Sequence, residues 1–316
     1  MDTEDVVVII PTLDEATTVG EVVAGFRVQG FDAIVVIDGP SSDATPTVAA
    51  NAGATVLRQQ GRGKGAAVRE AVEATDRPVI VLVDGDGTYR PEEVGELLAP
   101  IDAGAAHVIG NRFGRMQAGA MTRLNRVGNR IINWGFRRIH GAGLTDILSG
   151  YRAFTRDSYE ALQLTADGFG IETQMAVECA KREVPTAEVD ITYRPRVAGS
   201  ETNLRPVRDG GIIIIELLRR AKTTNPLVYF GSLGAIAMLL GAAVGAYVIY
   251  RWTTAGASHE LLAVAAVSGV IFGGQLLIFG FLADMLVSLQ RELVDRVGDE
   301  PSSAEEPADG TKVRGR

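Results

Sequence analysis

Apolar, β-branched runs alternate with helical patterns in the first part of the chain, and this alternation restricts the fold more than any other feature. The runs begin at Val6, Ala33, Ala54 and Val79, and Gly or Asp residues end the helical segments between them. Strand–helix–strand units of this kind form a parallel sheet with helices on both faces. The sequence therefore predicts an α/β fold with a doubly wound, mainly parallel sheet.

Polar and acidic clusters follow three of these predicted strands, at positions 11–15, 38–43 and 84–86. In a doubly wound sheet, ligands bind beyond the carboxyl ends of the strands, where the strand order reverses. We therefore expect all three clusters to face one crevice. Further along, "HVIGNRF" predicts another strand and 121–139 predicts a helix.

Two aspartates, Asp84 and Asp86, stand after the fourth strand with only Gly85 between them. Residues at i and i+2 of an extended chain point to the same side, and two adjacent carboxylates are unfavourable unless a cation lies between them. Such a pair suits a hard divalent cation whose coordination is completed by phosphates. The pair is therefore the first candidate for a metal-binding and catalytic site.

A glycine-rich stretch, "GRGKGAA", offers a competing interpretation, because Gly61, Gly63 and Ala66 match the G-x-G-x-x-A pattern of dinucleotide-binding proteins. That pattern belongs after the first strand of its unit, where this chain has "PTLDE" instead. A Walker loop is excluded because Gly65 follows Lys64 where Ser or Thr is required. The stretch leaves Lys64 near a helix N-terminus, suited to contact a diphosphate.

Two late apolar segments, 226–250 and 261–286, raise the mean hydropathy to +0.13 and are each long enough to cross a bilayer. The segment 210–225 predicts an amphipathic helix at the membrane surface, and the polar tail 295–316 predicts disorder. The acidic N-terminus does not resemble a signal peptide. Basic residues before the first span place the preceding domain and the C-terminus in the cytoplasm by the positive-inside rule.

Composition excludes several classes of protein. A single cysteine, Cys179, rules out an internal disulfide and a cysteine-based zinc site. The net charge of −8 argues against nucleic-acid binding, because such domains are basic.

Seven motifs in order resemble family 2 inverting glycosyltransferases, and within them the dolichyl-phosphate sugar synthases. The motifs are "PTLDE", "DGPSSDAT", "GKG", "DGDGTYRP", "GNRF", "RVGN" and "DILSGYRAF", and "GSETNLRPVRDG" extends the match. The resemblance implies a GT-A-like domain over residues 1–209, a nucleotide-diphosphate sugar donor, a Mg or Mn ion, and a polyprenyl phosphate acceptor.

The resemblance also implies roles for particular residues. Asp84 and Asp86 are expected to bind the metal and the donor diphosphate. The nucleotide is expected to lie against Pro11, Thr12, Asp14, Glu15, Asp38 and Lys64. The phosphates of donor and acceptor are expected to contact Arg112, Arg126 and Arg205, since the arginine fork suits phosphate.

Two further residues of the last motif have expected roles. Asp146 is expected to orient the acceptor or the sugar, and Arg152 to contact a phosphate. Two positions depart from the resembled pattern: Gly39 replaces the second aspartate of "DDGS", and Thr88 stands where some members have an amide side chain. Both departures bear on which nucleotide is bound.

The expected reaction is transfer of one hexose to dolichyl phosphate with inversion, for protein N-glycosylation or other glycan assembly, with UDP-glucose favoured over GDP-mannose as donor. A phosphate monoester with a second pKa of about 6 is mostly dianionic at neutral pH and needs no strong general base. Three alternatives remain open: N-acetylhexosaminyl transfer, a non-catalytic lipid-binding module, and a nicotinamide oxidoreductase based on the Gly61 pattern.

Overall fold

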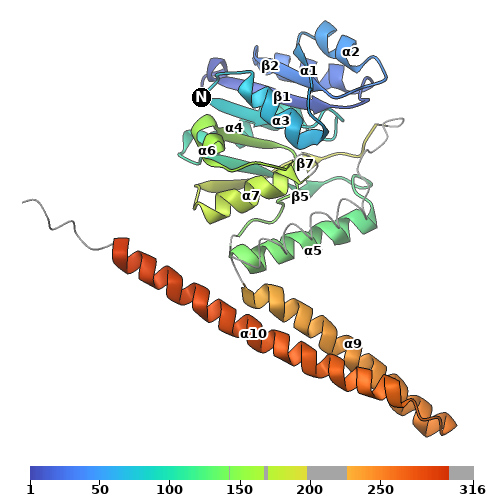
Figure 1. The fold of residues 1–316 in the computed structure, drawn as a ribbon. Coiled ribbons are helices and arrows are strands. Elements are labelled where there is room, and N and C mark those ends of the chain that lie inside the picture. The colour runs from blue at the N-terminus through green and yellow to red at the C-terminus, as the bar shows by residue number, and fades with distance from the viewer. Residues whose placement is uncertain (142, 167–169, 198–225, 299–316) are drawn as a thin grey trace, which may run out of the picture. The chain divides into compact units, whose positions relative to one another are not determined.

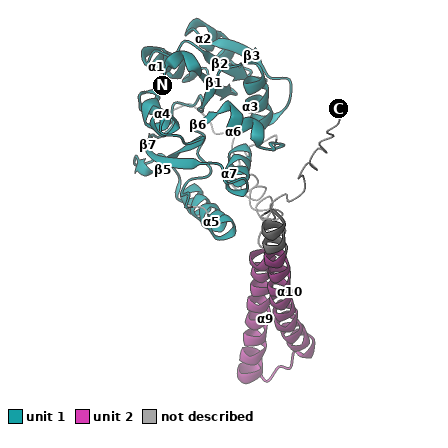
Figure 2. Ribbon diagram, turned by 90° about the vertical axis from the view of Figure 1, so that its left-hand side faces the viewer, with its two compact units in different colours: residues 1–220 teal, residues 221–316 magenta. Residues whose placement is uncertain are grey.

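The computed structural model describes residues 1–141, 143–166, 170–197 and 226–298, and the chain divides into two compact units, 1–220 and 221–316 (Figures 1 and 2). Three sequence predictions, namely Arg205, the juxtamembrane helix over 210–225 and the tail beyond 298, lie outside the described residues.

Unit 1 is built on a seven-stranded sheet in the order β3-β2-β1-β4-β6-β5-β7. The strands are β1 (Val6–Thr12), β2 (Ile34–Asp38), β3 (Thr55–Arg58), β4 (Val79–Leu82), β5 (His107–Met116), β6 (Arg152–Thr155) and β7 (Thr186–Tyr193). All neighbouring pairs are parallel except those that β6 makes with β4 and β5. The predicted doubly wound, mainly parallel sheet is therefore confirmed.

Helices cover both faces of this sheet (Figure 1). They are α1 (Val19–Val28), α2 (Thr45–Asn51), α3 (Gly63–Glu73), α4 (Val94–Asp102), α5 (Arg123–His140), α6 (Arg156–Ala161) and α7 (Ile171–Lys181), with short 3-10 turns η1 (Thr3–Asp5) and η2 (Pro91–Glu93). The predicted helix over 121–139 corresponds to α5. Its first turn is capped by the Thr122 hydroxyl, which accepts a hydrogen bond from the Asn125 amide at 3.2 Å.

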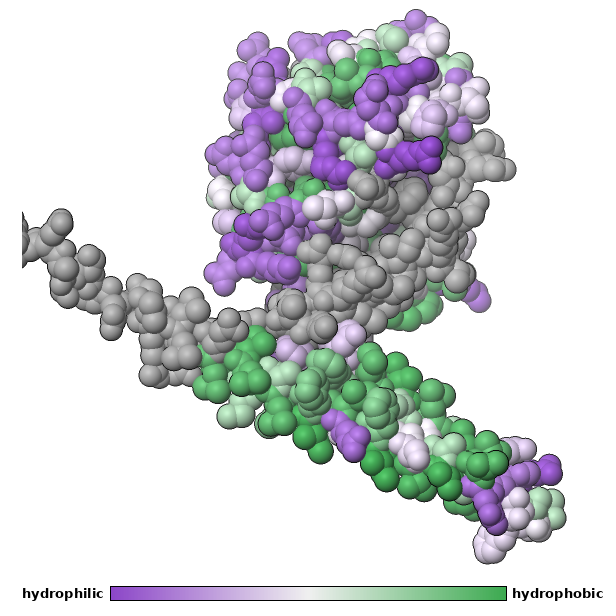
Figure 3. Space-filling view, viewed as in Figure 1, coloured by the Kyte–Doolittle hydropathy of each residue, from purple (hydrophilic) through white to green (hydrophobic). Residues whose placement is uncertain are grey.

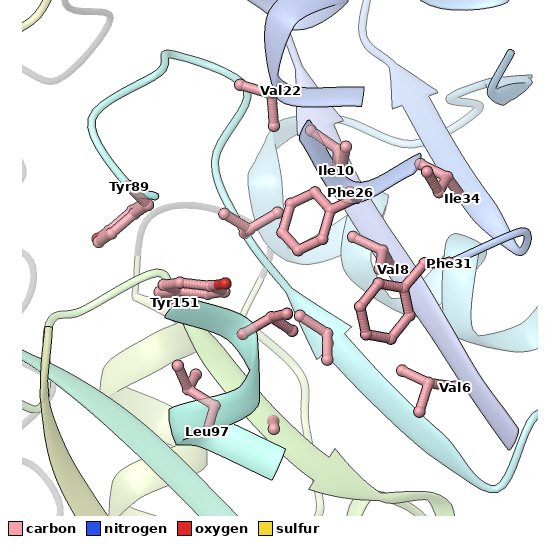
Figure 4. Packing of buried hydrophobic residues seen from close by; sticks show 14 of the residues in the cluster. Val6, Val8, Ile10, Val22, Phe26, Phe31, Ile34, Tyr89, Leu97 and Tyr151 are labelled. Carbon is pink, nitrogen blue, oxygen red and sulfur yellow. The ribbon is translucent and has the colours of Figure 1, made fainter. Parts of the chain in front are cut away.

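The alternation of side chains along β1 explains why the sheet needs cover on both faces. Val6, Val8 and Ile10 belong to a core with residues of α1 and α4, whereas Val7 and Ile9 belong to a second core with α3 and α7. Figure 4 shows the first core, in which side chains of β1 pack against aromatic rings. Each such fully buried aliphatic side chain contributes about 1.5–3 kcal/mol to folding.

The strand order reverses beside β1. The chain first extends the sheet outward through β2 and β3, and then returns to place β4 on the other side of β1. In such sheets the crevice at this reversal is the usual binding site. It lies here between the carboxyl ends of β1 and β4, at Thr12 and Leu82.

Unit 2 consists of two long helices, α9 (Pro226–Ala255) and α10 (Glu260–Gly298). Both are long and apolar enough to cross a membrane, and Figure 3 shows their largely hydrophobic surface. α10 continues past residue 295, where the sequence predicts the tail to begin, because the polar residues after the apolar stretch still favour a helix. The apolar run therefore marks the extent of a possible span and not the end of the helix.

Glycines allow α9 and α10 to pack closely. A Cβ atom built on Gly273 would lie 2.5 Å from the Gly234 carbonyl oxygen, and one built on Gly241 would lie 2.7 Å from the Ala266 oxygen. Such contacts between backbones are typical of helices packed within a membrane.

Candidate active site

The "DGDG" sequence forms a turn at the end of β4. The strand ends at Leu82, and Gly87 has φ 72°, so the two aspartates lie in the turn and not on the strand. Gly85 is required here because a Cβ atom would lie 2.7 Å from Thr12 Cγ2 and would overlap the Glu15 carboxylate. The turn therefore lies directly against the segment that follows β1, as the sequence predicts.

Asp84 forms an ion pair with Lys64, the second residue of α3. The Lys64 ammonium also lies 2.5 Å from Glu172 Oε1 in the first turn of α7. Burial alone lowers the pKa of Lys64, but Asp84 and Glu172 together raise it above its ordinary value. The two acids thus favour the charged form of Lys64, which lies between them.

Asp86 is nearly inaccessible, with 2% of its surface exposed. Its Oδ2 lies 2.6 Å from Arg196 Nη2, and its Oδ1 accepts hydrogen bonds from the Thr88 amide at 3.0 Å and the Thr88 hydroxyl at 2.6 Å. Burial and the nearby Asp84 raise the pKa of Asp86, although Arg196 and Thr88 act in the opposite direction.

Glu15 is a third acid close enough to Asp84 and Asp86 to be affected by their charges. Burial, followed by the charges of Asp86 and Asp84, raises the pKa of Glu15 to about 9, and its Oε2 is a buried oxygen with no hydrogen-bond partner. Among the described residues, no cluster of three metal-ligating side chains is assembled. Asp84 and Asp86 nevertheless suit a hard divalent cation, because carboxylate oxygens are the ligands that such a cation prefers. In this structure the negative charges of the two aspartates are balanced by Lys64 and Arg196.

The segments after β1 and β2 are joined by hydrogen bonds. Thr12 Oγ1 and Ser41 Oγ donate to Asp38 Oδ1 at 3.3 Å and 2.6 Å, and the Ser42 amide donates to Asp14 Oδ1 at 2.7 Å. Asp14 has φ 57°, a left-handed conformation that aspartate tolerates better than most residues. The predicted nucleotide-contacting residues of both segments therefore lie together at one edge of the sheet.

Arg112 and Asp146 form a buried bidentate pair. Arg112 Nε and Nη2 each donate to the Asp146 carboxylate at 2.7 Å, and the Arg112 amide donates at 3.0 Å. Burial lowers the pKa of Arg112, but Asp146 raises it well above the ordinary value. Asn129 on α5 accepts a further bond from Arg112 at 2.9 Å. The pair thus joins β5, α5 and the segment before β6.

The other predicted arginines lie in different surroundings. Arg126 Nε is buried without a hydrogen-bond partner, and its Nη2 lies 3.4 Å from Met116 Sδ. Arg152 is fully buried and donates to the carbonyls of Ser149 at 2.9 Å and Ile147 at 2.6 Å. In this conformation Arg152 holds the loop before β6 and presents no exposed atom to a ligand.

Sequence reasoning missed Glu172 and Arg196, which complete the charge arrangement around Asp84 and Asp86. A signal for Glu172 is present, because it shares a helix stripe with Met175 and Cys179, both buried. A carboxylate on the buried side of a helix requires a cation or a hydrogen-bond donor beside it. Arg196 carries no comparable signal, because it follows β7 in an irregular segment.

The chain is similar to several known proteins. The model of glycosyl transferase family 2 matches residues 7–162. A relative from Haloferax volcanii, glycosyltransferase AglJ, is 54% identical over 299 residues, which cover 94% of this chain and 99% of the relative. The chain belongs to glycosyl transferase family 2. A dolichyl-phosphate hexose transferase from the same organism is 35% identical to this transferase over 66% of the chain and 91% of that protein.

A solved structure supports the fold of the transferase. Glucosyl-3-phosphoglycerate synthase from Mycobacterium tuberculosis, in complex with phosphoglyceric acid, superposes with a TM-score of 0.58 and 23% identity, covering 69% of this chain and 80% of that one. The predicted GT-A-like fold is confirmed. The oxidoreductase interpretation loses its basis, because Gly61 follows the edge strand β3 and not a strand at the reversal of strand order.

Proposed function

We propose that this transferase moves one hexose from a nucleotide-diphosphate sugar to dolichyl phosphate with inversion, and so supplies lipid-linked sugar for glycan assembly such as protein N-glycosylation. The names of two relatives support it: one is a dolichyl-phosphate hexose transferase, and another, a mycobacterial polyprenol monophosphomannose synthase, is 33% identical over 137 residues. UDP-glucose is our first choice of donor and GDP-mannose the second.

The observation that carries the proposal is the charge arrangement at the reversal of strand order. Two carboxylates, Asp84 and Asp86, are balanced there by Lys64 and Arg196. We assign Asp84 and Asp86 to a Mg or Mn ion, which when bound would neutralise the diphosphate leaving group. Lys64, released from Asp84, would then bind the diphosphate. Pro11, Thr12, Asp14, Glu15 and Asp38 would contact the nucleotide.

The acceptor side needs cationic groups but no strong base. The dianionic lipid phosphate attacks the anomeric carbon, and the bond to the diphosphate breaks on the opposite side. Arg126 is the best candidate to bind this phosphate because its buried Nε lacks a partner. Asp146 would act through Arg112, whose guanidinium it fixes. We keep Arg205 and Arg152 as candidate phosphate contacts, and for Arg152 the loop before β6 would have to open.

The apolar helices fit a reaction whose acceptor stays in the bilayer. We assign residues 1–209 to a cytoplasmic catalytic domain, 210–225 to a juxtamembrane helix, and 226–250 and 261–286 to two spans, with the C-terminal tail again in the cytoplasm. Such anchoring would raise the local concentration of the lipid acceptor at the site.

The decisive experiment measures transfer of labelled sugar into the organic-extractable fraction. Membranes containing the full chain receive dolichyl phosphate and one of several uridine or guanosine nucleotide sugars, with Mn or with a chelator. A chelator-sensitive lipid product formed from one donor is expected. Asp86→Asn should abolish it, whereas Asp76→Asn, at an exposed position, should not.

Two other outcomes would change the assignment. Product from an N-acetylhexosamine donor alone would favour N-acetylhexosaminyl transfer on the same scaffold. No product from any donor, with folded protein and acceptor present, would favour a non-catalytic lipid-binding module.

A further inference from the structure

Helix α10 carries a row of exposed side chains that repeats every seven residues. Its members follow one another at alternating steps of three and four residues, the spacing that places side chains on one side of a helix. Two members are polar, Ser268 and Gln275, and both are exposed. The apolar members are 46–88% exposed: Leu261, Val264, Ile271, Ile278, Leu282, Met285 and Leu289. We call this row the outer seam.

The outer seam lies on the side of α10 that faces away from α9. Gly273 marks the side that contacts α9, since a Cβ atom built on it would lie 2.5 Å from the Gly234 carbonyl oxygen. Gln275 stands two residues later, which is about 200° further around the helix. Helix α9 therefore leaves the outer seam uncovered.

Two polar side chains interrupt an otherwise apolar stretch of α10. From Leu261 to Ala283, every residue other than Ser268 and Gln275 is apolar. Gln275 lies at the middle of the candidate span Glu260–Leu289, about 20 Å from either end. A glutamine side chain is too short to reach the lipid headgroups from that depth, because the hydrocarbon layer is about 30 Å thick.

The Gln275 carboxamide has no hydrogen-bond partner within the described part of unit 2. Ser232 and Ser288, by contrast, donate their hydroxyl hydrogens to carbonyl oxygens of their own helices at 3.0 Å and 2.9 Å. A carboxamide without a partner is unfavourable in hydrocarbon. Gln275 therefore requires a polar group from outside the pair of helices α9 and α10.

We propose that the outer seam binds the outer seam of a second copy of this chain within the membrane, and that the two Gln275 side chains bond to each other. Copies inserted in the same direction place their α10 helices parallel. In parallel helices with a seven-residue repeat, identical positions meet in layers. A carboxamide has both donors and an acceptor, so two Gln275 side chains satisfy each other and fix the register of the helices.

The composition of the outer seam favours a second copy as its partner. A symmetric pair uses the same surface twice, so that surface must be complementary to itself. The seam carries no charged side chain, and identical seams therefore do not repel each other. Ser268, one repeat before Gln275, is small and allows the two backbones to approach closely. The inference rests on the two membrane spans of the proposed function, and not on the sugar transfer.

Cysteine cross-linking in membranes tests where the copies meet. Leu282→Cys, in the outer seam, and Phe281→Cys, beside it, are made separately in the full chain, and both positions are exposed. The native Cys179 is buried, and the parent chain with this cysteine alone is the blank. After mild oxidation, Leu282→Cys alone should give a disulfide-linked dimer. Identical seam positions of parallel helices lie within the limit of about 7 Å between Cα atoms that a disulfide requires.

Energy transfer between copies measures the contribution of Gln275. Donor and acceptor dyes are joined after Arg316, and the full chain is diluted with increasing lipid in liposomes. Gln275→Leu should raise the dissociation constant of the pair by roughly 10-fold, since two hydrogen-bonding groups are lost within hydrocarbon. Gln275→Asn keeps the carboxamide and should retain most of the affinity. Phe281→Leu, which alters an exposed side chain beside the seam, should leave the dissociation constant unchanged.

Extraction of the membranes with alkaline carbonate separates failure of this inference from failure of the proposed spans. A chain that stays in the membrane but forms no dimer would contradict the pairing alone, and would show that lipid or another protein covers the outer seam. Equal cross-linking at both cysteine positions, or a dimer that Gln275→Leu does not weaken, would also overturn the pairing. Release of the chain by carbonate would overturn both the spans and the pairing.

Discussion

Gly150, in the loop before β6, lies directly against Asp84 after β4: a Cβ atom built on Gly150 would be 2.5 Å from Asp84 Oδ2. A larger residue at this position must displace the carboxylate, because the Asp84 side chain is the most movable group in the contact. The position of a candidate metal ligand thus depends on a residue 66 positions later in the sequence.

Gly150→Ala should therefore leave the protein folded and lower kcat/KM by roughly 100-fold, the effect of moving a reacting group by about 1 Å. Steady-state transfer and a thermal melt of the detergent-solubilised chain check the two parts. Gly95→Ala is the matched control, since nothing beyond the adjacent residues and the backbone of its own helix lies within 4 Å of the added methyl group. Unchanged activity in the Gly150 variant would argue against a role for Asp84 in the reaction.

Glu15 should release a proton when Mn²⁺ binds. Its pKa of about 9 keeps the metal-free carboxyl group protonated at neutral pH, and a nearby cation favours the ionised form. Calorimetric titration in two buffers of different ionisation enthalpy should give about one proton per Mn²⁺ at neutral pH, and none well above the pKa of Glu15.

Glu15→Gln should abolish this release, and Glu21→Gln, at an exposed position of α1, should not. The same carboxyl group has a consequence for stability. The folded state keeps a proton that the unfolded state loses between the ordinary pKa of 4.5 and about 9. The contribution of Glu15 to the free energy of unfolding therefore falls as pH rises through that window.

Removing only one partner of the Arg112–Asp146 pair should be strongly destabilising, because the other partner is left as an unpaired buried charge. Asp146→Leu alone is expected to lower the free energy of unfolding of unit 1 by about 3–5 kcal/mol. Arg112→Met/Asp146→Leu should recover most of that loss without recovering transfer activity. Urea unfolding followed by circular dichroism measures the first effect, and Asp157→Leu at an exposed position serves as control. Full activity of the double variant would show that the pair is only structural.

The contact between α9 and α10 should depend on Gly273 and not on its neighbour. Gly273→Leu would force the side chain against the Gly234 carbonyl and Met238, whereas nothing beyond the adjacent residues and the backbone of its own helix lies within 4 Å of a Cβ atom on Gly274. Overpacking of this kind costs about 1–3 kcal/mol. The melting temperature of the solubilised chain should fall for Gly273→Leu and stay unchanged for Gly274→Leu. Equal behaviour of the two variants would mean that the helices do not pack through this face.

The sequence predicts the sheet well because β1 to β4 are continuous apolar runs separated by helices, a pattern with few other solutions. It also predicts that the segments after β1 and β4 meet, since Glu15 and Asp84 both follow the carboxyl ends of parallel strands. It does not predict that Lys64 reaches Glu172, because that contact depends on how α3 and α7 pack on the same face of the sheet. The sequence motif likewise does not predict that Arg152 is buried, since a buried and an exposed arginine cannot be told apart from the motif alone.

The reversed direction of β6 has a consequence for how the two substrates relate. Because β6 runs antiparallel to β4 and its first residue, Arg152, pairs with Leu82, the loop before β6 ends beside the turn that follows β4. If β6 were parallel to β4, the loop before β6 would lie at the opposite end of the strands, away from the turn that follows β4. One reversed strand therefore couples the proposed donor-binding and acceptor-binding residues, so that a substitution on either side alters the surroundings of the other.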